Sequence, residues 1–82
     1  EIVEMASIGA KHAGEINRLT RLFYKKFDDQ VLVAPQNPVE VDEYSEPQPD
    51  IAVLRPRDDF YTSSHPTPND VFLLIEVSDS TI

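Results

Sequence analysis

The sequence predicts a single α/β (α+β) domain in which one helix near the N-terminus flanks a mixed β-sheet. Apolar residues recur every three or four positions over residues 10–27, which is the period of an amphipathic helix. Most of the remaining apolar residues stand in short runs separated by polar, proline-rich segments, a pattern typical of strands and loops. The order is a strand, a helix and then three or four strands, so we expect the helix to pack on the sheet.

The first elements in chain order are a short strand and the helix. Residues 1–5, EIVEM, read as the strand, and Ser7 could cap the helix that follows. The apolar stripe of residues 10–27 is formed by Ala13, Ile16, Leu19, Phe23 and Phe27. We expect Asp28 and Asp29 to end this helix.

The remaining strands are predicted at residues 31–34, 38–41, 51–54 and 71–77. The segments between them, 42–50 and 55–70, are polar and rich in proline, so we expect loops. Residues 71–77, VFLLIEV, are apolar at nearly every position, which predicts a central strand covered on both faces.

Length and composition limit the class of protein. Eighty-two residues suffice for one domain, and no apolar run approaches the roughly 20 residues that cross a bilayer. Without cysteine there is neither a disulfide nor a thiolate zinc site. We therefore expect a soluble, cytoplasmic protein with no membrane partner. Because Glu1 begins in strand-like sequence and Ile82 follows the last strand closely, we expect residues 1–82 to be the N-terminal portion of a larger domain, truncated at the C-terminus.

The net charge of −8 disfavours a generic nucleic-acid-binding surface, which is usually basic. The charge is unevenly distributed. Residues 1–27 carry five basic and three acidic side chains, a net +2, whereas residues 28–82 carry two basic and twelve acidic ones, a net −10. Basic side chains opposite the apolar stripe are candidates for phosphate contacts: Lys11, Arg18, Arg21 and Lys25. The alternative is an ordinary solvated helix face.

Glu76 lies in an otherwise apolar strand, where a carboxylate needs a cation, a metal ion or hydrogen-bond donors. Asp50 begins the short strand 51–54. Suppose that this strand pairs antiparallel with 71–77 so that Asp50 faces Glu76. Every residue from Asp50 to Leu54 then has a partner in the other strand.

In this register Ala52 lies opposite Leu74, and Leu54 lies opposite Phe72. Two facing carboxylates destabilise a sheet unless a cation lies between them, and two oxygen ligands favour Mg²⁺ or Mn²⁺. A shift of one residue would separate the pair. The alternative is structural, with Asp50 capping a turn and Glu76 pairing with Arg55 or Arg57.

Three stretches together resemble the PD-(D/E)XK nuclease superfamily and, within it, the Uma-two family of restriction endonucleases. They are SEPQPDIAVL (45–54), VFLLIEVSDST (71–81) and the opening EIVEM with SIGAKHAGEINRL (7–19). The resemblance implies a restriction-endonuclease-like, four-stranded mixed sheet flanked by helices. It also implies Mg²⁺ or Mn²⁺ as cofactor and hydrolysis of DNA phosphodiester bonds. Asp50 would be the motif's aspartate and Glu76 its second acid, both catalytic and metal-binding, and the Val77 carbonyl would be a further metal ligand.

The motif's lysine would fall at position 78, which is Ser78. In the Uma-two family this lysine has moved onto the next helix, which would lie beyond Ile82, and no lysine follows Lys26 here. An ammonium near the metal positions water and stabilises the charged transition state. We therefore expect residues 1–82 alone to be inactive.

Two residues of the helix are further candidates. His12 falls toward the core side near the helix start, which fits a hydrogen-bonded structural histidine, whereas the resemblance makes it a neighbour of the active site. Glu15 could be the acid that some nucleases of the superfamily carry on this helix. His65 precedes Pro66 in a loop, and we expect it to be exposed and without a role.

The sequence is compatible with three functions. The first is a Mg²⁺-dependent endonuclease with DNA as its partner, with a homodimer left open. The second is a non-catalytic domain of the same fold that binds DNA or protein. The third is a protein-interaction module that uses the proline-rich loop 42–50.

Overall fold

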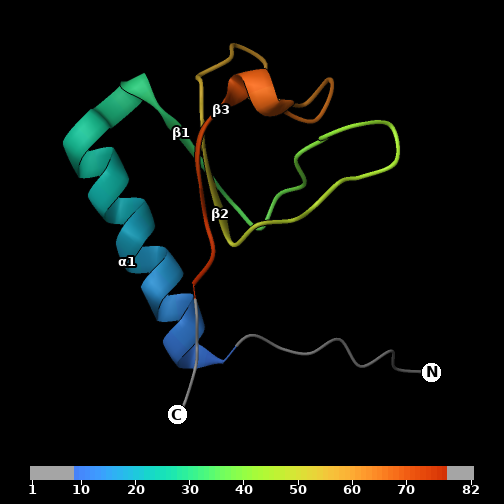
Figure 1. Cartoon of the computed structure of the whole chain (residues 1–82). Coiled ribbons are helices and arrows are strands. Elements are labelled where there is room, and N and C mark those ends of the chain that lie inside the picture. Colours follow the sequence, from blue (N-terminus) through green and yellow to red (C-terminus); the bar gives the residue numbers. More distant parts are fainter. Residues whose placement is uncertain (1–8, 78–82) are drawn as a thin grey trace.

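Residues 9–77 are described by a computed structural model of the chain, and they form one helix packed on a three-stranded sheet (Figure 1). The helix α1 spans Ala10–Phe27, and a short 3₁₀ turn, η1, covers Asp28–Gln30. The strands are β1 (Leu32–Pro35), β2 (Ile51–Leu54) and β3 (Val71–Ile75), and a second 3₁₀ turn, η2, covers Pro68–Asp70. No helix among residues 9–77 is long and apolar enough to cross a membrane.

The helix has the bounds that its apolar stripe predicts. Its N-cap is Gly9, whose carbonyl accepts a hydrogen bond from the Ala13 N–H at 3.0 Å. The helix ends at Phe27, and its C-cap Asp28 leaves the helical conformation with φ 52°. The predicted strand at residues 1–5 and the predicted Ser7 cap lie outside the described residues.

The three strands form an antiparallel meander in the order β1-β2-β3. The predicted register of β2 and β3 is confirmed at Ala52, which pairs with Leu74. It is wrong at Leu54, which pairs with Val71 and not with Phe72, because an irregularity between Val53 and Leu54 shifts the register by one residue. The described strands contain no parallel pair, so the mixed character predicted for the sheet is not present among residues 9–77.

The central strand is β2, in which all four side chains are buried. The prediction of a central strand at 71–77 is wrong for the described residues, because β3 ends at Ile75 and lies at the edge of the sheet. Three of its side chains are 46–57% exposed: Phe72, Leu73 and Leu74. The apolar character of these side chains predicts that they are buried, but no segment within residues 9–77 covers them.

The predicted strand at 38–41 is also wrong, because residues 36–50 form one long loop. The Val39 N–H donates to the Pro47 carbonyl and the Glu40 N–H to the Pro66 carbonyl, at 2.9 and 2.8 Å, so these groups join loops and not a ladder. Pro38 has no N–H to give to a neighbouring strand. Val39 is only 2% exposed, so its apolar character reflects a loop packed into the core.

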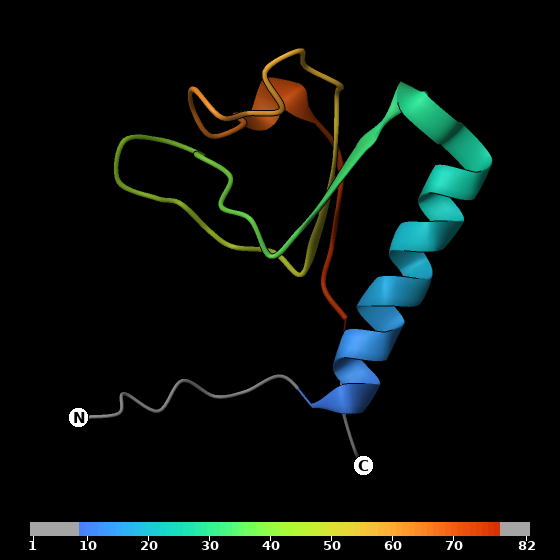
Figure 2. The ribbon, with the colours of Figure 1, turned by 180° about the vertical axis from the view of Figure 1, so that it is seen from behind.

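The sheet separates two apolar clusters. Val33, Ile51 and Val53 point toward α1 and pack with Ile16. Ala34, Ala52 and Leu54 point the other way and pack with Val39 of the loop. Seen from both sides, α1 lies against one face of the sheet, and loops 36–50 and 55–70 lie on the other side (Figures 1 and 2). The core is therefore two thin layers that share β2.

Loop 55–70 is held by the Asp59 carboxylate. It accepts hydrogen bonds from Arg57 Nε at 2.6 Å and Arg57 Nη2 at 3.0 Å, and from the Tyr61 and Ser63 N–H groups at 3.1 and 3.2 Å. These bonds keep Phe60 and Tyr61 in the left-handed conformation, with φ 54° and 62°. The Arg57 guanidinium, with help from Ser63 and Tyr61, holds the pKa of Asp59 far below its ordinary value.

We expect the conformation of this loop to depend on acid. Because the pKa of Asp59 is lower in the folded protein than in the unfolded chain, its charge stabilises the folded loop above about pH 4. That contribution is lost as the pH falls through the folded pKa. The amide resonances of Tyr61 and Ser63, followed by NMR in the full-length protein, should stay native at pH 4 and shift only in stronger acid. Asp59→Asn should already show the acid-form positions at pH 7. An Asp59→Asn loop identical to the wild type at pH 7 would contradict this account.

Candidate active site at the end of the sheet

The candidate site lies where β2 begins and β3 ends. Asp50 immediately precedes Ile51, and Glu76 and Val77 immediately follow Ile75. Because Ile51 pairs with Ile75, the antiparallel register brings Asp50 and Glu76 to the same end of the sheet. The N-terminal turns of α1, which carry His12, come to this end as well (Figure 1).

Asp50 is the centre of this group. Its Oδ2 accepts a hydrogen bond from the Val77 N–H at 2.8 Å. Its Oδ1 lies 3.3 Å from His12 Nε2. The Glu76 side chain is near enough to contribute to lowering the pKa of Asp50. Groups from α1 and from the end of β3 therefore converge on one carboxylate at the start of β2.

The environment keeps Asp50 ionised. The N–H of Val77 lowers the pKa of Asp50 most, and His12 and Glu76 lower it further, against the effect of burial. The Asp50 side chain is 18% exposed and that of His12 is 13% exposed, whereas Glu76 is exposed. The site is thus a shielded carboxylate with a second carboxyl beside it that faces solvent.

The two carboxyl groups fit a divalent cation. Two carboxylates at the same end of a sheet repel one another unless a cation lies between them, and a hard divalent cation can bind both groups. Magnesium and manganese prefer such oxygen ligands and commonly retain several waters. Within residues 9–77 no three His, Cys, Asp or Glu side chains are grouped so as to hold a metal, so two carboxylates and a backbone carbonyl are the donors that this part of the chain offers.

The structural alternative for Glu76 does not agree with the observed contacts. Arg57 binds Asp59, and Arg55 donates to the Asn69 carbonyl at 3.0 Å. Asp50 does not cap a turn of its own loop; its Oδ2 instead receives an N–H from across the sheet, 27 residues away. His65 is exposed, as expected, with Nε2 3.9 Å from a Glu46 carboxylate oxygen.

The helix candidates have different surroundings. Glu15 is partly exposed and forms an ion pair with Arg18 on the same helix, so the structure gives it a helix-surface partner. The predicted phosphate contacts are all on the exposed side of α1: Lys11, Arg18, Arg21 and Lys25. Ser78, where the motif's lysine would fall, lies outside the described residues.

Sequence reasoning did not find the contacts of His12 and of the Val77 N–H with Asp50. The helical wheel placed His12 on the core side, which was a usable signal, but it named no partner. For Val77, the family resemblance indicated only that its carbonyl binds metal, and nothing in the sequence indicated that its N–H binds Asp50. Both contacts depend on where α1 crosses the end of the sheet, and a local pattern does not encode that position.

Comparison with known proteins agrees with the architecture. Residues 1–81 match the Uma2 family, whose description is "Putative restriction endonuclease". Neither the curated proteins nor the solved structures gave a significant match. One helix on an antiparallel sheet is consistent with a fragment of a restriction-endonuclease-like fold. Since the match covers nearly every residue, the chain belongs to the Uma2 family.

Proposed function

We propose that this chain supplies the metal-binding carboxylates of an endonuclease that hydrolyses DNA phosphodiester bonds with Mg²⁺ or Mn²⁺. The observation that carries the proposal is the convergence of Asp50 and Glu76 at one end of the sheet, with the Val77 N–H on Asp50. Membership of a family described as restriction endonucleases supports the choice of DNA as substrate.

Each residue of the site has a distinct part in this proposal. Asp50 stays ionised and ready to bind a cation, because the Val77 N–H stabilises its charge and fixes its orientation. Glu76 provides the second carboxylate, and the Val77 carbonyl is the proposed third oxygen ligand. The bound ion would supply Lewis acidity for attack of water on the phosphodiester. His12 is the proposed positioning residue that holds Asp50 from the helix side.

A lysine is the group that this site still needs. All lysines of the chain lie at or before Lys26, on or around α1. We propose that an ammonium group from outside residues 1–82 completes the site, as the family resemblance implies. The isolated segment is therefore expected to bind a metal ion weakly and to be inactive.

The proposed DNA contacts on α1 have a salt dependence that can be measured. If Lys11, Arg21 and Lys25 contact phosphates, the DNA association constant should fall as salt is added. Each contact should make the slope of its logarithm against the logarithm of the salt concentration more negative by about 0.9. Lys25→Gln in the full-length protein should therefore weaken binding of every DNA sequence equally and flatten the salt dependence by about one unit. Lys26→Gln is the matched control, because Lys26 lies over the Phe27 ring and off the basic face. Equal effects of both variants would remove α1 from the DNA interface.

The proposed function is tested by cleavage of plasmid DNA by the full-length protein. We expect nicked or linear product in Mg²⁺ or Mn²⁺, and none after chelation with EDTA. Metal and DNA binding without cleavage, in a protein whose lysine is in place, would instead support a non-catalytic domain of the same fold. The net charge of −10 over residues 28–82 is the feature that favours this second function.

A further inference from the structure

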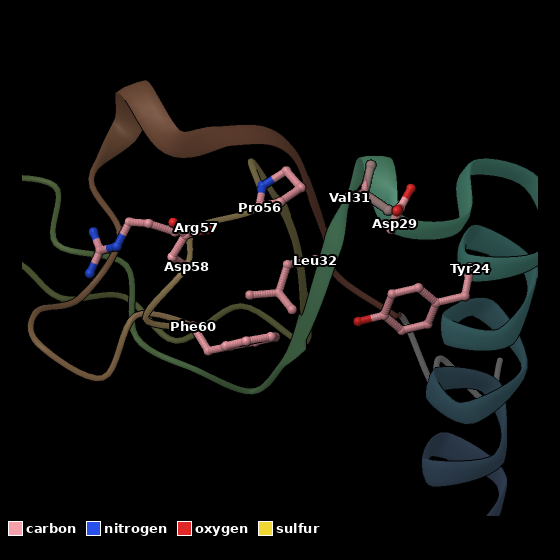
Figure 3. Close-up of a pocket in the computed structure, with 8 residues that line it drawn as sticks. All are labelled: Tyr24, Asp29, Val31, Leu32, Pro56, Arg57, Asp58 and Phe60. Carbon is pink, nitrogen blue, oxygen red and sulfur yellow. The ribbon is translucent and has the colours of Figure 1, made fainter.

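A second candidate site lies in a pocket between the C-terminal half of α1, the start of β1 and the start of loop 55–70. Its volume is about 380 Å³. Tyr24 and Phe60 contribute aromatic rings, Asp29 and Asp58 contribute carboxylates, and Leu32 and Pro56 contribute an apolar wall (Figure 3). Tyr24 follows His12 by twelve residues on α1, a rise of about 18 Å, so this pocket is distinct from the Asp50 site.

The Tyr24 ring and the backbone of Phe60 are held in place before any ligand arrives. The Tyr24 hydroxyl accepts a hydrogen bond from the Val33 N–H at 3.0 Å, which ties the ring to β1. Phe60 is 69% exposed and has φ 54°, an unfavourable conformation for a residue with a bulky side chain. The hydrogen bonds that Asp59 accepts from its neighbours maintain this conformation. Residues held in sparsely populated backbone conformations cluster at binding and active sites.

The charge of the pocket is negative. Asp29 and Asp58 are both exposed. Arg57 also lines the pocket, but its guanidinium binds Asp59 and Ser64 and lies 4.1 Å from the Tyr61 ring centroid. Figure 3 shows this guanidinium extending away from Leu32 and Tyr24. The two carboxylates of the lining are therefore not neutralised by the one cationic side chain that the described lining contains.

We propose that this pocket binds an arginine side chain of a basic peptide segment from a protein partner. The Leu32 and Pro56 wall suits the methylene stem, and Tyr24 and Phe60 offer faces on which a planar guanidinium stacks. Asp29 and Asp58 accept hydrogen bonds from its fork of N–H groups. A phosphate group would meet two carboxylates here, so charge complementarity favours a basic peptide over nucleic acid.

The test is an NMR titration of the full-length protein with a capped five-residue peptide that carries one central arginine among glycine and serine. We expect shifts at the amides of Tyr24, Leu32 and Phe60, and much smaller ones with citrulline in place of arginine. Phe60→Leu keeps apolar bulk but loses the ring, so the peptide should bind roughly three- to fivefold more weakly. Asp29→Asn with Asp58→Asn should weaken binding by about tenfold at low salt.

Matched controls lie on loop 36–50. Tyr44→Ala removes a 90% exposed aromatic ring, and Asp42→Asn removes an exposed carboxylate, both outside the pocket lining, so neither should change the affinity. Equal binding of the citrulline peptide would overturn the proposal, as would equal losses in the controls. A thymidine oligonucleotide that shifts the same amides in preference to the peptide would overturn it too. Because Asp50→Asn leaves the pocket intact, peptide binding and DNA cleavage can fail independently.

Discussion

The Asp50→Asn variant of the full-length protein is expected to lose DNA cleavage by on the order of a thousandfold, because a metal ion contributes several kcal/mol of transition-state stabilisation. Asparagine has nearly the same shape as aspartate and still offers an oxygen to the Val77 N–H. It lacks the charge that binds the cation. Plasmid nicking rates at saturating Mg²⁺, with the metal affinity from Mn²⁺ titration, measure the effect.

Two further variants separate the roles within the site. Glu76→Gln should give a loss of the same order, because Glu76 is the second proposed ligand. His12→Gln should have a smaller effect, about 10–100-fold in metal affinity, because His12 acts on the metal only through Asp50. Asp42→Asn, an exposed acid in loop 36–50, is the matched control and should cleave at the wild-type rate. Wild-type cleavage by both Asp50→Asn and Glu76→Gln would remove the chemical basis of the nuclease proposal.

The second large effect concerns stability. Leu54 is 1% exposed and packs with Ala34, Val39 and Ala52 on the face of β2 that points away from α1. Leu54→Ala should reduce the free energy of unfolding by about 2–5 kcal/mol, the range for cavities in apolar cores. In a thin core this is a large share of the total, so a clear fall in the urea midpoint is expected.

The control for this substitution is Val41→Ala, which removes aliphatic bulk from a side chain that is 48% exposed. Its expected effect lies within about 0.5 kcal/mol. Leu54→Ala should also retain metal binding under conditions in which it is folded, because Leu54 lies at the opposite end of β2 from Asp50. A midpoint shift equal to that of Val41→Ala would show that the cluster around Leu54 contributes little to stability.

The sequence by itself determined the elements with strong local patterns. The bounds of α1 follow from the 3.6-residue period of Ile16, Leu19 and Phe23, and those of β2 from a short apolar run between polar, proline-rich segments. The register that sets Asp50 against Glu76 is only a hypothesis at the level of the sequence, because residues 71–77 are apolar at nearly every position and show no clear alternation. The pairs of Ile51 with Ile75 and of Ala52 with Leu74 agree with it.

Only the tertiary structure decided where these elements meet. The irregularity at Val53 and Leu54, the edge position of β3 and the burial of Val39 in a loop all depend on contacts between distant segments. The same is true of the contacts of His12 and of the Val77 N–H with Asp50. The period of the apolar residues shows which side chains are buried. It does not show which partner each one contacts, because the hydrophobic effect has no preferred direction. Hydrogen bonds require direction and distance, and these exist only once α1 and the sheet have packed.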